Sequence, residues 1–189
     1  FLTQDQFENE TFYNLDVHFC PECLTVQIGQ CPEGLDVFNG DYTFFTGTSS
    51  RMINHFANLA GIIKREHLPG NGLIAEMGSN DGTFLENFKD ENHIGLDPSS
   101  NVTEVAKSKG LNVYPYSFDA SFFDSHEIDV LVSSNVFAHI PDRHGVLDNI
   151  EKSLSMDGIW VNEEPYLRNI IDNLAYDQFY NEHIFYTSI

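Results

Sequence analysis

The chain of 189 residues is long enough for one good-sized domain with a small appendage, and its 41% hydrophobic and 13% aromatic content can build a core. A net charge of −20, from 9 Lys and Arg against 29 Asp and Glu, excludes nucleic-acid binding, which needs clustered basic side chains to neutralise phosphates. The longest apolar runs are far too short to span a bilayer, so we expect no membrane partner either.

Residues 1 to about 40 contain short aromatic, strand-like pieces, such as residues 11–17, and a Cys-x-x-Cys pair formed by Cys20 and Cys23. Cys31 is the third cysteine. Three cysteines do not make a disulfide framework, so we expect a reducing, cytoplasmic setting and a metal or redox motif. The chain begins without Met and stops just after an aromatic-rich segment, which we interpret as the mark of a fragment.

Residues 49–65 carry apolar side chains three or four positions apart, the spacing of an amphipathic helix. Thr48, Ser49 and Ser50 favour a helix start here, because hydroxyl oxygens accept hydrogen bonds from the first free N–H groups of a helix. Residues 69–72 (Pro-Gly-Asn-Gly) then break the chain before the next zone.

Beyond this break, short apolar runs that predict strands alternate with segments that predict helices. The expected strands are residues 72–76, 93–97, 111–114, 128–134 and 158–163, and the expected helices run from 82 to about 89, from 102 to 109 and from about 146 to 154. Repeated strand–helix units of this length predict an α/β fold with a doubly wound, mostly parallel sheet and right-handed crossovers.

The turn after the first expected strand runs from Glu76 to Gly82 and has a second glycine at Gly78. In a doubly wound sheet, ligands bind outside the carboxyl ends of the strands. Glycines there let the backbone approach a ligand and turn sharply. The second strand ends in Asp97, whose carboxylate can accept both hydroxyls of a ribose. The pattern therefore predicts a ligand that contains adenosine.

Two cofactors compete for this turn. A dinucleotide needs Gly-x-Gly-x-x-Gly, so that the backbone and a helix N-terminus hold its pyrophosphate, but the middle glycine is absent. Acidic Glu76 and Asp81 suit instead the cationic sulfonium and amino group of S-adenosylmethionine, which the turn therefore favours. The alternative is a glycine turn without a ligand. Asn135 ends the fourth strand at the same rim, either as a cofactor contact or as a turn former.

Several short motifs follow one another in a characteristic order. They are the glycine turn and residues 95–98 (Gly-Leu-Asp-Pro), 135–139 (Asn-Val-Phe-Ala-His), 163–167 (Glu-Glu-Pro-Tyr-Leu) and 180–186 (Tyr-Asn-Glu-His-Ile-Phe-Tyr). In this order they resemble the sugar C-methyltransferase family, whose members methylate nucleotide-linked deoxyketosugars. The resemblance spans essentially the whole chain, although each motif alone is weak.

The resemblance implies a Rossmann-like class I S-adenosylmethionine-dependent methyltransferase domain, preceded by a small truncated zinc-binding-type segment. The expected boundaries are 1–40 for the zinc-domain remnant, 41–68 for a substrate-bordering segment and linking helix, and 69–189 for the methyltransferase domain. The family's C-terminal domain would follow this chain. The turn and the resemblance together assign cofactor binding to Glu76, Gly78, Ser79, Asn80, Asp81, Gly82, Asp97, Pro98, Asn135 and Val136.

The zinc site of the family uses two Cys-x-x-Cys pairs, and Cys20 and Cys23 match the second pair. Two thiolates leave a half site, because structural zinc takes four ligands. Cys31 is a makeshift third ligand or, more in keeping with a single cysteine, a buried inert thiol. We expect no firmly bound zinc in this chain, with zinc possible in the intact protein only.

The catalytic segment of the family is a Tyr-His-Glu-His run, matched here by Tyr180, Glu182 and His183, whereas Asn181 departs from it. The resemblance implies that His183 is the base that removes a proton from the carbon next to a ketone, a role that suits a histidine at neutral pH. Glu182 and Tyr180 would orient it or stabilise the enolate. The alternative is that this segment is ordinary polar surface.

Residues 41–50 resemble the aromatic-plus-serine segment that borders the sugar nucleotide in the family, where a tyrosine assists catalysis. Tyr42 keeps the hydroxyl that this role needs, whereas Phe44 cannot donate a proton. Four residues are expected to border the substrate. They are Phe44, Ser49, His55 on the following helix, and Tyr166 from the Glu-Glu-Pro-Tyr-Leu motif. His55 as a capping or core-edge residue is the alternative.

The sequence thus predicts an enzyme that transfers the methyl group of S-adenosylmethionine to carbon in a nucleotide-linked deoxyketosugar. A methyltransferase that acts on oxygen or nitrogen of another small molecule is a second interpretation, since a Glu–His pair would still act as a base. A third is a cofactor-binding module with no activity as a fragment.

Overall fold

A computed structural model of the chain describes residues 3–32, 34–123 and 127–188. The chain divides into two compact units. One is Gly34–Glu164, and the other joins Phe1–Glu33 with Pro165–Ile189. This division differs from the expected boundaries, because residues 165–189 group with the N-terminal residues and not with the sheet. The expected division into 1–40, 41–68 and 69–189 stays a prediction.

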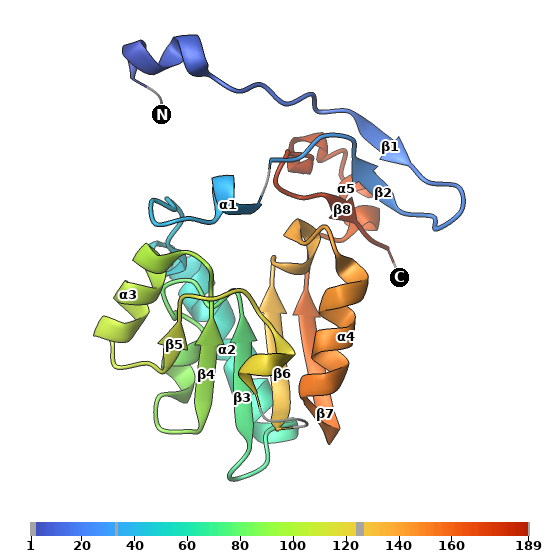
Figure 1. Ribbon diagram of the computed structural model, residues 1–189. Coiled ribbons are helices and arrows are strands. Elements are labelled where there is room, and N and C mark those ends of the chain that lie inside the picture. The colour runs from blue at the N-terminus through green and yellow to red at the C-terminus, as the bar shows by residue number, and fades with distance from the viewer. Residues whose placement is uncertain (1–2, 33, 124–126, 189) are drawn as a thin grey trace. The chain divides into compact units, whose positions relative to one another are not determined.

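The larger unit, Gly34–Glu164, contains a five-stranded parallel sheet (Figure 1). Its strands are β3 (Leu73–Met77), β4 (His93–Leu96), β5 (Val113–Tyr114), β6 (Ile128–Ser134) and β7 (Leu154–Glu163), in the order β5-β4-β3-β6-β7. The chain starts in the middle of the sheet, adds strands on one side and then returns to add strands on the other. The carboxyl end of β3 is therefore the topological switch point, where ligands bind in such folds.

Helices and short 3-10 turns complete this unit. They are α1 (Gly34–Val37), η2 (Thr46–Thr48), α2 (Ser50–Glu66), η3 (Leu85–Phe88), α3 (Ser100–Ser108), η4 (Ala120–Phe122), η5 (Phe137–His139) and α4 (Arg143–Ser153). The predicted start of α2 is confirmed, because Ser49 Oγ accepts a hydrogen bond of 3.3 Å from Met52 N.

Helices α2 and α4 cover opposite faces of the sheet, and the alternation of strand side chains explains why (Figure 1). Val130 and Val132 of β6 pack in the same core as Phe56 of α2. Leu131, which lies between them in the strand, packs with Ile150 of α4 on the other face. By the same alternation Glu76 lies on the α2 face, two residues after Ile74, a member of the α2-side core.

One expected helix in this unit and one expected strand in the other are wrong in kind or position. Residues 82–89 form turns and the short η3, in which Phe84, Leu85 and Phe88 are buried and the side-chain amide of Asn87 donates to the carbonyl of Phe84 (2.9 Å). That amide satisfies a carbonyl which a continuing α-helix would have used. The expected strand at residues 11–17 is irregular, and the nearest strand, β1, begins only at Val17.

The smaller unit contains a three-stranded antiparallel sheet in the order β1-β2-β8. Its elements are η1 (Gln4–Asn9), β1 (Val17–Phe19), β2 (Val26–Ile28), α5 (Leu167–Asp172), η6 (Tyr176–Gln178) and β8 (Phe185–Tyr186). Its small core gathers Ile28, Leu167, Ile170 and Tyr186. Strands β2 and β8, whose paired residues are 158 and 160 positions apart in the sequence, therefore share one sheet, which local patterns do not predict.

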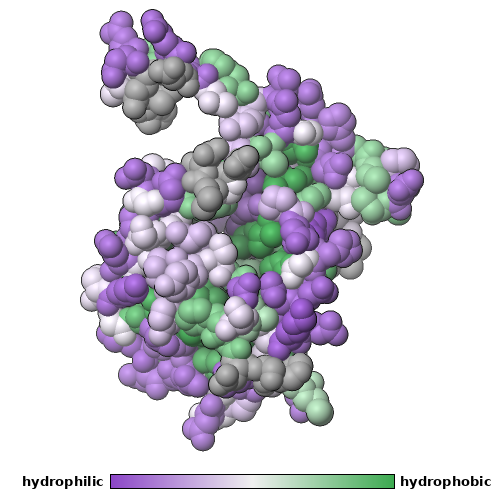
Figure 2. All heavy atoms as spheres, in the orientation of Figure 1, coloured by the Kyte–Doolittle hydropathy of each residue, from purple (hydrophilic) through white to green (hydrophobic). Residues whose placement is uncertain are grey.

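Hydrophilic residues cover much of the face seen in Figure 2, in keeping with the net charge of −20. Within residues 3–32, 34–123 and 127–188, no helix has both the length and the apolar character needed to cross a bilayer. The same described ranges contain no group of three or more His, Cys, Asp or Glu side chains placed to hold a metal ion.

Candidate functional site

The turn after β3, residues 78–82, is here called the cofactor loop. Gly78 has φ +73°, and a Cβ atom on it would lie 2.3 Å from Cγ2 of Val136, so only glycine fits there. Gly82 has φ +78°, and its Cβ would lie 2.3 Å from Cδ1 of Leu111. Positive φ values and close neighbours thus explain why both positions are glycine. The loop lies at the switch point of the sheet.

Asp97, the predicted ribose-binding residue, anchors the cofactor loop from the end of β4. Its Oδ2 accepts a hydrogen bond from Asn80 N (2.9 Å), and its Oδ1 accepts one from Ser99 N (2.8 Å). Burial raises the pKa of Asp97, although these backbone hydrogen bonds act in the opposite direction. The carboxylate is therefore fixed in orientation. The half-buried Pro98 continues the chain between Asp97 and Ser99.

Glu76 lies at the carboxyl end of β3 and is only 4% exposed. Burial raises the pKa of Glu76 well above its usual range, and the nearby carboxylates of Asp97 and Asp81 raise it further. Its Oε2 has no hydrogen-bond partner among the described residues. A buried carboxylate in this state favours a ligand that brings positive charge, because a cation would compensate the lost hydration.

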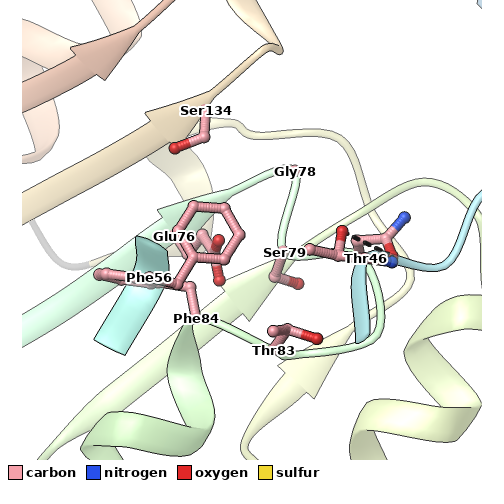
Figure 3. Close-up of a pocket in the computed structure, with 9 residues that line it drawn as sticks. Thr46, Phe56, Glu76, Gly78, Ser79, Thr83, Phe84 and Ser134 are labelled. Atoms are coloured by element: carbon pink, nitrogen blue, oxygen red, sulfur yellow. Dashed lines mark hydrogen bonds between the residues drawn. The ribbon is translucent and has the colours of Figure 1, made fainter. Parts of the chain in front are cut away.

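A small cavity of about 30 Å³ lies beside Glu76 (Figure 3). It is lined by Thr46, Phe56, Glu76, Gly78, Ser79, Asn80, Thr83, Phe84 and Ser134. The hydroxyl oxygens of Ser79 and Ser134 are buried and, like Glu76 Oε2, lack a hydrogen-bond partner among the described residues. These groups fit the cationic and polar end of S-adenosylmethionine in chemistry. In volume the cavity matches about one water molecule, so it is far smaller than the whole of S-adenosylmethionine.

One wall of the cavity comes from residues 44–48, here called the strap, which the sequence did not place beside the cofactor loop. Asn80 Oδ1 accepts hydrogen bonds from Thr46 N (3.0 Å) and Thr46 Oγ1 (3.2 Å), and Asn80 Nδ2 donates to Phe44 O (3.1 Å). Gly47 N donates to Asp81 Oδ2 (2.9 Å). The strap is thus fastened to the loop by both of these side chains.

Asp81 was expected to face the cationic part of the cofactor, and the structure shows which groups already engage it. Oδ1 accepts a hydrogen bond from Thr83 Oγ1 (2.6 Å), and Lys109 Nζ lies 3.8 Å from Oδ2. Lys109 also donates to the backbone carbonyl of Asp81 (2.8 Å). With Gly47 on Oδ2 as well, both carboxylate oxygens are used within the protein. A direct cofactor contact by Asp81 stays a prediction.

The turn after β6, residues 135–137, is here called the β6 loop, and it lies next to the cofactor loop through the contact of Val136 with Gly78. Asn135 has φ +56°, and its N–H donates to Glu163 O (2.7 Å). Glu164 Oε1 accepts hydrogen bonds from Val136 N (3.1 Å) and Phe137 N (2.7 Å). Sequence reasoning missed Glu164, although its motif was noted, because its partners lie 27 and 28 residues away.

The expected substrate residues of this unit surround the same end of the sheet. His55 Nε2 lies 2.7 Å from Glu163 Oε2, and Glu163 is paired in register with the cavity residue Ser134. The carbonyl of Tyr42 accepts a hydrogen bond from Asn101 Nδ2 (2.7 Å) at the start of α3, whereas Phe44 is 53% exposed. The hydroxyl of Ser49 caps α2, which gives it a structural role.

The smaller unit holds the remaining predicted site residues. His183 is 2% exposed, and its Nε2 lies 2.6 Å from Oη of Tyr180, which is 39% exposed. Burial raises the pKa of the neighbouring Glu182. Tyr166 precedes α5, is 38% exposed, and forms a β-bridge with Thr187. The structure thus brings Tyr180 and His183 into direct contact, and their catalytic role stays a prediction.

Cys20 and Cys23 lie at the connection between β1 and β2 in this same unit, where Leu24 N donates to Cys20 O (2.9 Å). All three cysteines are free thiols, and Cys31 is half-buried. A hydrogen bond from the Thr25 side chain is the main reason that the pKa of Cys23 is lowered. The half zinc site stays a prediction.

The chain is similar in sequence to a family of known proteins. Residues 48–189 match a family model described as a methyltransferase domain. C-methyltransferase NovU of Streptomyces niveus is 32% identical over 194 residues, which cover 98% of this chain and 46% of NovU. Carboxy-S-adenosyl-L-methionine synthase of Campylobacter jejuni is 33% identical over 134 residues, 62% of this chain and 57% of the relative. The chain thus spans about half the length of the curated relatives it matches.

A solved structure of a SAM-dependent methyltransferase from Thermotoga maritima shares the fold, with a TM-score of 0.55 and 19% identity over 72% of this chain and 67% of that one. The parallel sheet and its switch point give the chain the Rossmann-like fold that this methyltransferase shares. The chain belongs to the methyltransferase domain family. The predicted Rossmann-like fold and the predicted S-adenosylmethionine cofactor are therefore confirmed, whereas the zinc-binding-type segment stays a prediction.

Proposed function

We propose that the protein is a C-methyltransferase that acts on a nucleotide-linked deoxyketosugar. The observation that carries this proposal is the likeness to C-methyltransferase NovU, which covers 98% of the chain and so includes both compact units. The segment with Tyr180, Glu182 and His183 supports it, because these residues resemble the catalytic run of sugar C-methyltransferases. The sugar, as distinct from the transfer to carbon, rests on that resemblance alone.

S-adenosylmethionine supplies an electrophilic methyl group on a cationic sulfonium. In this chain Glu76 provides negative charge next to the cavity, and Asp97 provides a fixed carboxylate for the ribose hydroxyls. Ser79 and Ser134 offer hydroxyls that are not engaged by other described residues. We assign the cofactor to this end of the sheet on the basis of the polar groups there that lack partners.

The acceptor chemistry needs a base, and the buried position of His183 suggests how it works. Because His183 is almost fully buried and its Nε2 lies 2.6 Å from Tyr180 Oη, the half-exposed Tyr180 hydroxyl is the part of the pair that a substrate reaches. The pair takes the proton from the carbon next to the ketone, leaving an enolate. That carbon then forms a bond to the methyl group as the sulfur–methyl bond breaks, which leaves S-adenosylhomocysteine; the ketone re-forms, and the proton remains on the pair.

The other predicted substrate residues have supporting roles in this proposal. Glu182, with its raised pKa, orients the base or stabilises the developing enolate. Tyr42 supplies a hydroxyl, and His55, held by Glu163, contacts the sugar nucleotide from α2. Phe44 in the larger unit and Tyr166 in the smaller unit are each exposed, and each offers an aromatic ring on which a nucleotide can stack.

Exchange of the carbon-bound proton tests the proposed chemistry directly. In heavy water, the intact protein should exchange the proton next to the ketone of a nucleotide-linked ketosugar, and the exchange should be lost in His183→Asn and strongly reduced in Tyr180→Phe. His67→Asn, an exposed histidine at the end of α2, is the matched control and should exchange normally. Methylation of acceptors without a ketone, with no exchange, would show an O- or N-methyltransferase instead.

The relatives also support a second candidate. Carboxy-S-adenosyl-L-methionine synthases match 62% of the chain, and a protein of that kind would change the cofactor and leave no methylated acceptor. Mass spectrometry of the cofactor after turnover separates the two functions, because only the synthase yields a cofactor that has gained a carboxyl group. We favour the C-methyltransferase because the NovU match extends over the smaller unit as well. A chain that binds the cofactor but neither methylates an acceptor nor yields a carboxylated cofactor would be a cofactor-binding module.

Cys20 and Cys23 complete the proposal as half of a zinc site in the intact protein, with the partner pair on another segment. Metal analysis of the intact protein tests it: one zinc per chain, lost in Cys23→Ser, is expected. Cys31→Ser is the control, since Cys31 is assigned no ligand role. Zinc content unchanged by Cys23→Ser would contradict the assignment.

A further inference from the structure

Glu164 makes an unusual set of contacts for a residue just outside a strand. It directly follows β7, and its Oε1 accepts hydrogen bonds from two successive backbone N–H groups, those of Val136 (3.1 Å) and Phe137 (2.7 Å). Its Oε2 is buried and has no hydrogen-bond partner among the described residues. Hydrogen bonds to a carboxylate are about twice as strong as neutral ones. Glu164 therefore fixes the backbone of the β6 loop.

The β6 loop needs such support because its first residue is strained. Asn135 adopts φ +56°, a left-handed conformation that costs a residue with a Cβ atom about 1 kcal/mol. The Asn135 N–H donates to Glu163 O (2.7 Å), so two consecutive residues at the end of β7 hold the loop. The backbone of Glu163 fixes the start of the loop, and the side chain of Glu164 fixes its next two residues.

Val136 carries this constraint to the cofactor loop. Its side chain lies so close to Gly78 that a Cβ on that glycine would be 2.3 Å from Val136 Cγ2. Gly78 itself lines the cavity, has φ +73°, and donates its N–H to Leu96 O (2.7 Å). A shift of Val136 therefore changes the space available to the backbone on which the cofactor rests.

We propose that Glu164 is a positioning residue for the cofactor: by holding the β6 loop, it keeps Val136 against Gly78 and so fixes the shape of the cofactor loop. The inference depends on cofactor binding at this loop and is independent of the acceptor. A purely structural Glu164 would stabilise the fold without changing affinity in the folded protein. A positioning Glu164 changes affinity, and its effect passes through Val136.

The test measures the dissociation constant for S-adenosylhomocysteine by calorimetry with the full chain. Glu164→Ala should weaken binding by about tenfold to a hundredfold, because the two hydrogen bonds that hold the β6 loop are lost. Glu164→Gln should stay within about threefold of the wild type, since its amide oxygen accepts from the same two N–H groups. Glu151→Ala, an exposed carboxylate on α4, is the matched control and should bind normally.

A double-mutant comparison shows whether the effect passes through Val136. Val136→Ala alone should weaken binding, and Glu164→Ala should add little in that background, because the contact it supports is already gone. A folded Glu164→Ala that binds like the wild type overturns the proposal, and so does full additivity of the two changes. If Glu164→Ala fails to fold, Val136→Ala decides, since wild-type affinity there would overturn the proposal. No binding by the wild type would instead refute the cofactor site itself.

Discussion

Gly47 and Asp81 are in direct contact: the Gly47 N–H donates to Asp81 Oδ2 at 2.9 Å, and a Cβ on Gly47 would lie 2.7 Å from the same oxygen. The same Cβ would lie 2.9 Å from Oγ1 of Thr83, which is itself bonded to Asp81. Any side chain at position 47 therefore separates the strap from the cofactor loop. This contact links the wall of the cavity to the loop that is expected to hold the cofactor.

Gly47→Ala is expected to release the strap. The loss of the Gly47–Asp81 hydrogen bond and the added contact should lower the free energy of unfolding by about 1–2 kcal/mol. Because Thr46 lines the cavity, the same change should speed association of S-adenosylhomocysteine, measured by stopped-flow mixing. A less stable protein with an unchanged association rate would show that the strap does not control entry.

Gly61→Ala is the matched control for this change. Gly61 lies in α2, where a Cβ would meet nothing within 4 Å, so alanine should stabilise the helix by up to about 1 kcal/mol. Its association rate should equal that of the wild type. A faster rate in Gly61→Ala would mean that general changes in stability, and not the strap, set the rate.

Glu76 should make the affinity for S-adenosylmethionine depend on pH. Burial and two nearby carboxylates raise the pKa of Glu76, which favours a proton on this side chain in the free protein. A cationic ligand favours the ionised form, so binding releases this proton and the dissociation constant falls as pH rises, by at most about tenfold per unit. Calorimetry in buffers of different ionisation enthalpy would measure the released proton.

Glu76→Gln should remove this proton release and weaken the binding of S-adenosylmethionine. S-adenosylhomocysteine lacks the sulfonium charge, so its affinity should depend less on pH than that of S-adenosylmethionine. Glu151→Gln, on the exposed side of α4, serves as the control with unchanged proton release. Equal pH dependence in Glu76→Gln and wild type would place the titrating group elsewhere.

The sheet was predictable because its signals are local. The strand expected at 128–134 matches β6 residue for residue, since its apolar residues 130–132 are buried on both faces of the sheet. The bounds of the helix expected at 49–65 differ by one residue from those of α2. Its apolar spacing and its cap both depend on residues that are close in the sequence. Asp97 and the glycines of the cofactor loop followed from the same order of elements.

The contacts that close the site were not predictable in this way. Thr46 and Asn80 are 34 residues apart, and neither has a local pattern that indicates the other. Glu164 was noted within a motif, but its role depends on a turn 27 residues earlier. The expected helix at 82–89 failed because tertiary packing of Phe84 and Phe88 outweighed helix propensity.

Ionisation of the buried Glu164 side chain should lower the free energy of unfolding as the pH rises. Burial raises the pKa of Glu164 from 4.5 to about 7, with a smaller contribution from Glu163, so the folded state holds a proton that the unfolded state has lost. Unfolding free energy should therefore fall between about pH 4.5 and 7, by up to about 3 kcal/mol. The free energy of unfolding, measured by chemical denaturation across this pH range, should fall more steeply in the wild type than in Glu164→Gln.

The difference between the two proteins is the informative quantity, because Glu76 and Asp97 shift stability in the same direction. Those two groups are common to both proteins and largely cancel. At about pH 8, Glu164→Gln should be the more stable of the two, since it removes a buried charge but keeps the acceptor oxygen. Parallel pH profiles would show that Glu164 titrates near its ordinary pKa in the folded protein.

Tyr186→Phe should disturb the Tyr180–His183 pair without affecting the cofactor loop. Tyr186 is 1% exposed; its Oη accepts a hydrogen bond from Tyr180 N (3.1 Å) and donates one to Gln178 O (3.0 Å). Phenylalanine leaves that N–H and carbonyl unsatisfied, at a cost of about 1–3 kcal/mol within the smaller unit. Amide hydrogen exchange should therefore become faster at Tyr180, and proton exchange of the ketosugar should slow.

Binding of S-adenosylhomocysteine should stay unchanged in Tyr186→Phe, because its expected site lies in the other compact unit. Tyr176→Phe is the matched control: this tyrosine is 81% exposed, and its loss of a hydroxyl should change neither measurement. A different result is possible: in Tyr186→Phe, amide hydrogen exchange at Tyr180 becomes faster while proton exchange of the ketosugar keeps its wild-type rate. The orientation of Tyr180 would then not matter to the reaction. The base would then have to be sought outside the Tyr180–His183 pair, with the His55–Glu163 pair at the end of β7 as the next candidate.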